Sequence, residues 1–243
     1  PAPRVPFRDP AFGRCVARVT DRSADVESGD DSRGIKNEYS RVQAWNADGS
    51  LFLLRGLAAT WYVWDPATLR KVRKLPDEGI TDPRWDATDP RTLWFVDGTR
   101  LRTMDVGTGV ATTRRDFAND FPGRSLAAVW TRWEGSPSAD GRYWGLMAED
   151  EGWEAVAFLV YDAVEDRVVA TRDVSAWPAA RESDSVTISP SGRFFLAQCE
   201  PCPEGTLGTD ASPCGLMAWD RELENGRGLV RAPAVVRLRR GGA

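Results

Sequence analysis

The chain has 243 residues, of which 32 are basic and 36 acidic, so its formal net charge is −4 at pH 7. This balance argues against a nucleic-acid-binding protein that neutralises phosphates with Lys and Arg, and no apolar run approaches the roughly 18 residues that a membrane-spanning helix needs. The sequence contains no histidine, which excludes a Ser-His-Asp triad, a Cys-His pair and a His-ligated metal site built from this chain alone.

The first predicted element is a short strand at about residues 14–20, which contains the sequence Cys-Val-Ala-Arg-Val-Thr. Residues 1–10 lack the basic stretch and following apolar run that mark a signal peptide. We therefore expect no signal peptide within this chain.

From residue 39 onward the chain repeats one pattern four times. Each repeat contains a tight-turn signal of the Asp-Gly kind or a close variant, which is typical of β-hairpins. The turn signals lie at 45–49, 85–90, 137–141 and 188–192. An apolar strand follows each of them, at 51–54, 93–96, 143–147 and 194–197. The third strand of each repeat ends in a hydrophobic residue and then Asp65, Asp105, Asp162 or Asp220.

The polarity of these strands predicts their burial. The second and third strands of each repeat are almost wholly apolar, which is typical of strands covered on both faces. The fourth strand alternates, as at residues 71–75, which suits an outer strand with one face in water.

Four-stranded antiparallel units that recur every ~40 to ~58 residues predict an all-β fold, namely a β-propeller. The four blades are expected at about 39–76, 80–117, 128–174 and 184–231. A β-sandwich is the competing all-β architecture, but it does not explain the repeated order of tight turn and closing Asp.

The repeats resemble those of TolB-type, WD-repeat-like β-propellers of bacteria, which carry an Asp-Gly turn followed by a strand ending in Trp or Tyr and then Asp. More narrowly, residues 39–49 and 134–144 resemble a group of uncharacterised exported propeller proteins. The resemblance covers about residues 4–231. It implies a propeller fold and a periplasmic or secreted location, but it implies no activity, because propellers host many functions.

Propellers of this type usually have about six to eight blades, and four are recognisable here. The chain is expected to be either a small four-bladed ring or a piece of a six- to eight-bladed one. The early strand at about 14–20 favours the piece. Such a strand often completes the last blade of a closed ring, whereas residues 228–231 already supply a fourth strand to the last repeat.

The cysteines lie at positions 15, 199, 202 and 214. Cys199, Cys202 and Cys214 fall in or beside a Pro- and Gly-rich loop, and a disulfide from Cys214 to either of the other two would staple that loop. A Cys₄ zinc site and reduced thiols are the alternatives. A thioredoxin-like role is disfavoured, because Pro201 and Pro203 flank Cys202 in a loop where that motif opens a helix. A disulfide would indicate an oxidising compartment.

A propeller ligand usually binds at the mouth of the central channel, near the starts of the innermost strands. These starts are expected at about 38–41, 81–84, 132–135 and 182–185. The predicted ligand-binding rim consists of Tyr39, Arg41, Asp82, Arg84, Trp133, Glu134 and Asp184. Arg and carboxylate groups could hold a sugar acid or a peptide terminus, and the aromatic rings could stack on a sugar. The alternative is a solvated mouth in which the charged groups pair with one another.

Residues 149–153, with the sequence Glu-Asp-Glu-Gly-Trp, join the middle strands of the third repeat. Their carboxylates lack the alternating spacing of a calcium loop, so we expect a solvated acidic loop and no metal.

These observations predict a non-catalytic ligand- or protein-binding propeller without a cofactor. Its partner would be an unknown protein, peptide or glycan. The alternative is an accessory or partial propeller of a secreted enzyme, of the serine-peptidase or polysaccharide-lyase kind, so enzymatic activity stays open.

Overall fold

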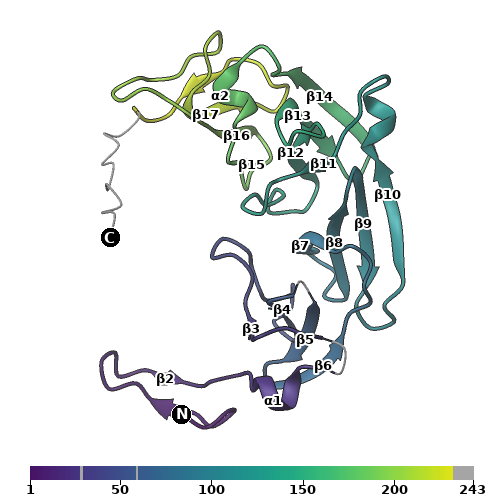
Figure 1. Ribbon diagram of the computed structural model, residues 1–243, viewed down its shortest axis with the longest axis vertical. Coiled ribbons are helices and arrows are strands. Elements are labelled where there is room, and N and C mark those ends of the chain that lie inside the picture. The colour runs from purple at the N-terminus through teal and green to yellow at the C-terminus, as the bar shows by residue number, and fades with distance from the viewer. Residues whose placement is uncertain (28–29, 59, 232–243) are drawn as a thin grey trace. The chain divides into compact units, whose positions relative to one another are not determined.

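The computed structural model describes residues 1–27, 30–58 and 60–231, and its regular structure consists of antiparallel β-sheets (Figure 1). The helices of these residues are four residues long each, namely α1 (Arg22–Asp25), η1 (Phe117–Asp120) and α2 (Pro178–Arg181). The prediction of an all-β fold is confirmed.

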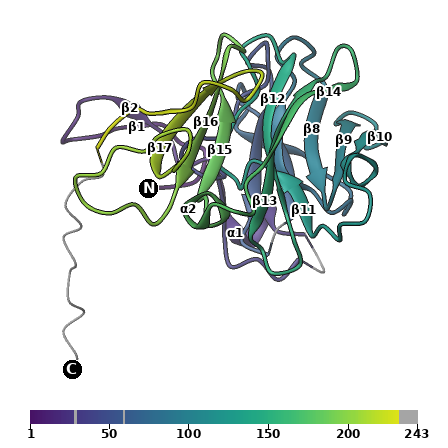
Figure 2. The same cartoon turned by 90° about the horizontal axis from the view of Figure 1, so that it is seen from above.

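Four sheets contain four strands each, and the strands follow chain order within every sheet. The first sheet contains β3 (Ile35–Lys36), β4 (Phe52–Gly56), β5 (Trp61–Asp65) and β6 (Arg70–Lys74). The second contains β7 (Thr81–Trp85), β8 (Thr92–Asp97), β9 (Arg100–Asp105) and β10 (Ala111–Asp116). The third contains β11 (Ala128–Trp130), β12 (Tyr143–Glu149), β13 (Ala155–Asp162) and β14 (Arg167–Asp173). The fourth contains β15 (Ser185–Ile188), β16 (Phe194–Cys199), β17 (Gly215–Asp220) and β18 (Arg227–Gly228). Figure 2 shows β8, β9 and β10 as successive neighbours in the second sheet.

The chain divides into two compact units. One unit contains residues 1–97 and 101–114, which include the first sheet and most of the second. The other contains residues 98–100 and the chain from 115 onward, with the third and fourth sheets. Each unit has a core of its own.

In the first unit, strands β4 and β5 are covered on both faces. Leu53 and Val63 join Leu93 and Phe95 of β8 in one buried cluster, while the alternate residues Phe52, Leu54, Tyr62 and Trp64 form a second cluster on the opposite face. The neighbouring β6 is charged at four of its five positions, and all its residues are at least partly accessible to water. The predicted contrast between apolar middle strands and a polar outer strand is confirmed for this sheet.

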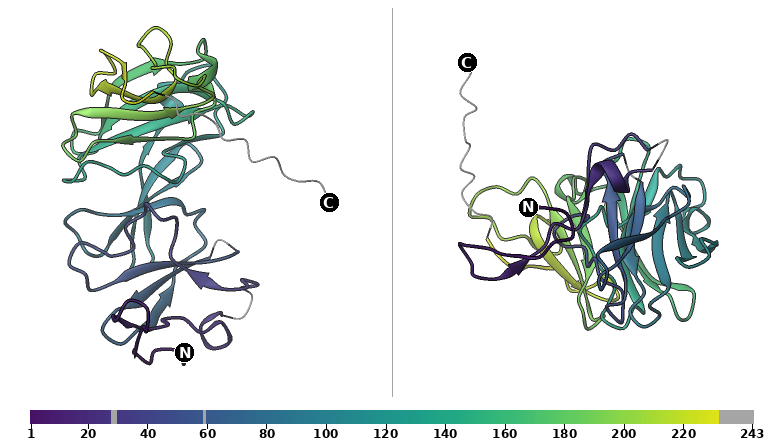
Figure 3. Two further views of the ribbon diagram at one scale, coloured as in Figure 1. Left: turned by 90° about the vertical axis from the view of Figure 1, so that its left-hand side faces the viewer. Right: turned by 90° about the horizontal axis from the view of Figure 1, so that it is seen from below.

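In the second unit, the third and fourth sheets pack against each other (Figure 3, green to yellow). Every residue of β13 is buried. Phe158 of this strand lies 5.2 Å from Phe195 and 5.8 Å from Trp219, measured between ring centroids. Large aromatic side chains that interlock in this way remove much apolar area from water and hold the two sheets together.

The repeated tight turns link the first and second strands of each sheet in the same way. A backbone N–H donates to the carbonyl oxygen that lies just beyond the turn, from Asn46 to Leu51, Asp86 to Thr92, Ser138 to Tyr143 and Ser189 to Phe194. Gly49, Gly141 and Gly192 have φ between 67° and 74°, a conformation that glycine adopts without a steric penalty. This requirement explains why glycine recurs at these turns.

The Asp that ends each third strand closes the following turn. Carboxylate oxygens of Asp65, Asp105, Asp162 and Asp220 accept backbone N–H groups two to four residues further on. A short carboxylate at this position satisfies turn donors that no strand partner can reach. The recurring Asp therefore has a structural role in every sheet.

The predicted strand at about 14–20 contains β2 (Cys15–Val16), which pairs with β1 (Phe7–Arg8) as a hairpin. A separate, parallel bridge joins Pro3 and Arg18. In the part of the chain that the structure describes, no helix has the length and apolarity needed to cross a membrane.

Candidate functional site

The seven predicted rim residues occupy different positions relative to their strands. Tyr39 and Arg41 are exposed and lie in a turn after β3, whereas the exposed Asp184 comes directly before β15. The expected strand starts at 38–41 and 132–135 are wrong, because β3 and β11 end before them. The backbone turns after each of these short strands and so ends the strand pairing there. Arg132 in the second turn has a positive φ. One common mouth for all seven residues stays a prediction.

Asp82 and Arg84 of β7 form a buried ion pair. The Arg84 Nη2 atom lies 2.7 Å from Asp82 Oδ1, and the two residues are 5% and 2% exposed. Asp82 has a φ of 52°, and the pairing of β7 with β8 shifts register between Thr81 and Arg84. This bulge brings both side chains together inside the protein, where they neutralise each other.

The other predicted aromatic residue, Trp133, belongs to a group of three tryptophans in the second unit. The Trp130 ring lies 5.5 Å from the Trp133 ring and 5.8 Å from the Trp153 ring, measured between centroids. Trp130 is buried, Trp133 is half-buried and Trp153 is 53% exposed. One buried indole thus supports two more accessible ones. We call these three residues the tryptophan cluster.

A buried carboxylate anchors this cluster. Glu149, at the end of β12, has no exposed surface. Its Oε2 accepts a hydrogen bond of 2.8 Å from Trp130 Nε1, and its Oε1 lies 3.2 Å from Arg132 Nη1. The expectation that 149–153 is a solvated loop is therefore wrong for Glu149, because the β12–β13 pairing extends to this residue after a register shift at Ala148, and its side chain is buried.

The pKa of Glu149 is raised above its ordinary value. Burial raises it most, and the nearby Asp150 charge adds to that effect, while Arg132 and the Trp130 hydrogen bond oppose it. Removal of a carboxylate from water disfavours its charged form, so Glu149 takes up a proton at a higher pH than a solvated glutamate.

Arg132 connects the tryptophan cluster to the segment before β15. Its Nη1 also donates to the Ser183 carbonyl oxygen at 2.8 Å, so the neighbourhood of Trp133 and Glu134 is tied to that of Asp184. Both of these contacts use Nη1, and 33% of the Arg132 side chain is exposed. A guanidinium held in this way presents further N–H donors in a fixed geometry.

The backbone around this site is unusual. Arg132, Trp133 and Trp153 have positive φ values of 58°, 74° and 61°. Bulky residues in this region cost about 1–3 kcal/mol each and persist where their surroundings hold them, frequently at ligand-binding positions. Positive φ also occurs outside this site, at Leu69 and Leu223 for example, so the side-chain geometry and not the backbone identifies these residues.

The rim predicted from the sequence includes Trp133, Glu134 and Asp184 but not Trp130, Arg132 or Glu149, which the structure places in contact with one another. The available signal was the sequence Trp-Thr-Arg-Trp at 130–133. Glu149 carried no signal, because its neighbours Asp150 and Glu151 made the segment resemble a surface loop.

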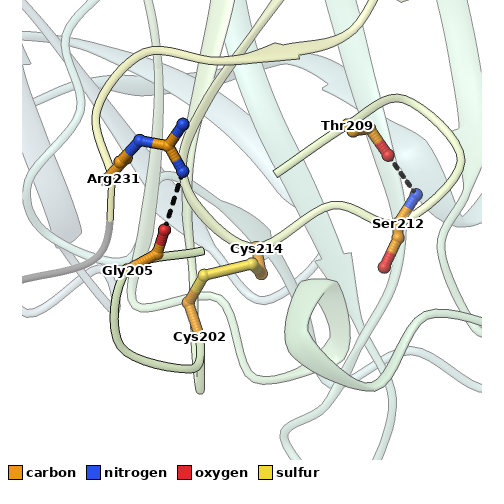
Figure 4. The surroundings of a disulfide bond; sticks show 6 residues. All are labelled: Cys202, Gly205, Thr209, Ser212, Cys214 and Arg231. Carbon is orange, nitrogen blue, oxygen red and sulfur yellow. Dashed lines mark hydrogen bonds between the residues drawn. A yellow bond between two sulfur atoms is a disulfide. The ribbon is translucent and has the colours of Figure 1, made fainter. Parts of the chain in front are cut away.

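The cysteine prediction is confirmed and sharpened. Cys202 and Cys214 form a disulfide with a Cα–Cα distance of 5.0 Å (Figure 4). In the same loop, Arg231 Nη1 donates to the Gly205 carbonyl oxygen at 2.9 Å. Cys199 is buried and free, and Cys15 is exposed and free. Among the described residues, no group of three or more Cys, Asp or Glu could hold a metal ion.

No protein-family model matches the chain, and no curated protein matches it either. Among solved structures, it is similar to oligogalacturonate lyase from Vibrio parahaemolyticus, with a TM-score of 0.63 and 13% sequence identity. The match covers 94% of this chain, which spans 59% of the lyase chain. The likeness to this propeller-fold protein, together with the four antiparallel sheets, confirms the β-propeller class.

Proposed function

We propose that this protein is a non-catalytic propeller that binds an acidic oligosaccharide at Arg132 and the tryptophan cluster. The observation that carries the proposal is the placement of Arg132. Glu149 and the Ser183 carbonyl contact its Nη1, Trp133 follows it in the chain, and a third of its side chain is exposed.

The chemistry of these groups suits an acidic sugar. A guanidinium binds a carboxylate through charge-assisted, often bidentate hydrogen bonds. Tryptophan rings offer flat apolar surfaces on which the apolar face of a sugar ring can stack. The fold similarity to an oligogalacturonate lyase supplies galacturonate oligomers as the first probe.

The experiment is a calorimetric titration of the purified protein with short galacturonate oligomers. Arg132→Ala should weaken binding about 10- to 100-fold, because a hydrogen bond to a charged group contributes about 1.5–3 kcal/mol. Trp133→Ala and Trp153→Ala should each weaken it about 2- to 10-fold through lost stacking.

Two matched variants control for general effects of charge and aromatic loss. Arg193→Ala removes an exposed arginine elsewhere in the second unit, and Trp45→Ala removes an exposed tryptophan of the first unit. Both should bind as the wild type does. Equal affinity of Arg132→Ala and wild type, or no binding of galacturonate oligomers by folded protein, would contradict the proposal.

The second candidate is a partial propeller of a secreted enzyme, which the fold similarity to a lyase favours. An assay for cleavage of galacturonate oligomers distinguishes the two. Cleavage that exceeds a buffer control and disappears in Arg132→Ala would support the enzyme, whereas binding without cleavage would support the non-catalytic reading.

We further propose that the protein acts in the periplasm or outside the cell, as the TolB-type resemblance implies. The disulfide between Cys202 and Cys214 supports an oxidising compartment. Thiol labelling of the protein in its native host, before and after reduction, tests this location. Full labelling of all four cysteines without reduction would contradict it.

A further inference from the structure

The proposed function assigns no role to the charge of Glu149, although this carboxylate contacts two residues of the site. Its Oε1 lies 3.2 Å from Arg132 Nη1, and its Oε2 accepts the Trp130 indole N–H. An ionised Glu149 therefore offsets the positive charge that Arg132 presents to a ligand. A protonated Glu149 leaves that charge uncompensated.

We propose that Glu149 is a positioning residue that sets the effective charge of the Arg132 site, so that capture of an anionic ligand tightens as the pH falls. This inference rests on the proposed function, because it concerns the same site. It adds the regulation of that site by protons, which the binding proposal by itself does not contain.

Arg132 keeps its place when Glu149 is protonated. Its Nη1 also donates to the Ser183 carbonyl oxygen at 2.8 Å, and this bond does not depend on the charge of Glu149. The buried Trp130 ring supports Trp133 at the same time. Protonation thus changes the electrostatic field of the site more than its shape.

The strand partners of Glu149 are uncharged. The strands on either side of β12 place only Ala128 and Ala155 opposite it, and Asp150 is the next residue in the chain. Glu134 belongs to the Arg132 turn, and Glu182 and Asp184 flank Ser183. The single variant Glu149→Gln distinguishes the effect of Glu149 from any effect of these four carboxylates.

Burial and Asp150 raise the pKa of Glu149, which moves its protonation toward neutral pH. A bound anion beside Arg132 disfavours the ionised carboxylate further. By thermodynamic linkage, binding and proton uptake must then favour each other. The affinity for the anionic ligand therefore rises as the pH falls through the raised pKa of Glu149.

The test measures the affinity for a galacturonate trimer between pH 4.5 and pH 8, where the sugar carboxylates stay largely ionised. Wild type should bind about tenfold more tightly at the acidic end, the size expected for one unit charge at a partly exposed site. Glu149→Gln should bind tightly at every pH. Arg193→Ala serves as the control and should follow the wild-type profile.

Two further measurements follow the proton directly. Calorimetry in two buffers of different ionisation enthalpy reports the protons taken up on binding, and wild type should take up a fraction of one proton. The ¹H–¹⁵N resonance of the Trp130 indole, assigned with Trp130→Phe, should titrate with pH because its acceptor is Glu149. A merely structural Glu149 would give no proton uptake.

The outcomes separate the two proposals. Binding that requires Arg132 but has the same pH profile in wild type and Glu149→Gln overturns the role of Glu149 alone. Absence of proton uptake overturns it as well. Absence of binding at every pH overturns the proposed function and pH-dependent capture together, even where the Trp130 indole titrates.

Discussion

Trp130 and Glu149 meet across the paired strands β11 and β12, where the indole Nε1 donates to the carboxylate Oε2 at 2.8 Å. Both residues are buried, and they lie 19 positions apart in the chain. An indole N–H and a carboxylate are costly to bury separately, and each satisfies the other here. Arg132 contacts Glu149, and the Trp133 and Trp153 rings lie against Trp130.

The first prediction concerns the acceptor role of Glu149. Glu149→Ala leaves the Trp130 indole N–H without its partner and should lower the free energy of unfolding by about 1–3 kcal/mol. Glu149→Gln keeps an oxygen acceptor of the same size and should cost less. Urea unfolding at pH 7 measures both, and an equal loss for the two variants would contradict the role of this hydrogen bond.

The second prediction concerns the buried pair of Asp82 and Arg84. Arg84→Met leaves the Asp82 carboxylate buried beside an uncharged side chain and should cost about 3–5 kcal/mol. The double variant Asp82→Asn with Arg84→Met should cost less than the sum of the two single changes, because it removes both members of the ion pair.

A surface pair provides the control for this cycle. Arg124 and Asp173 form an ion pair whose side chains are 42% and 54% exposed. Arg124→Met should change the free energy of unfolding by less than about 1 kcal/mol. Additive costs at Asp82 and Arg84 would mean that their proximity contributes nothing to stability.

The third prediction concerns the two free thiols. Burial raises the pKa of Cys199 to about 11, whereas Cys15 is exposed. Because the thiolate is the reactive form, an alkylating reagent at pH 8 should modify Cys15 quickly and Cys199 only after denaturation. Mass spectrometry of denatured, unreduced protein should find two modified cysteines, and four would show that the disulfide is absent.

The fourth prediction concerns the disulfide itself. Cys202 and Cys214 are 12 residues apart, and a link over a loop of this length stabilises a protein by about 3 kcal/mol. The variant Cys202→Ser with Cys214→Ser should unfold at a correspondingly lower urea concentration. Dithiothreitol should lower the stability of wild type but leave that of the variant unchanged.

The fifth prediction concerns pH and the turn after β13. Burial alone would raise the pKa of Asp162, but hydrogen bonds from Arg142 and from the N–H groups of Glu165 and Val164 lower it below 3.8. A carboxylate whose pKa is lowered by folding stabilises the folded state at pH values above its ordinary pKa. This stabilisation is lost as the pH falls through the lowered pKa. Asp162→Asn should therefore lower the stability at pH 7. The variant should also lose less stability than wild type on acidification, as measured by thermal unfolding between pH 2 and pH 7.

The repeated sequence patterns predicted most of the fold. Strands β4 and β5 follow from their continuous apolar residues, because such strands have no favourable place except between two covered faces. The turns at Gly49, Gly141 and Gly192 follow from a backbone conformation that few residues other than glycine adopt readily. These requirements act over a few residues, so they are visible in the sequence.

The site depended on contacts that no local pattern encodes. Asp82 and Arg84 looked like rim residues, but a bulge turns both inward to pair with each other. Glu149 looked like part of a solvated loop, but one further step of strand pairing buries it against Trp130 and Arg132. A sequence determines which residues carry charge, whereas the register between strands distant in the chain decides whether that charge meets water, a partner or a ligand.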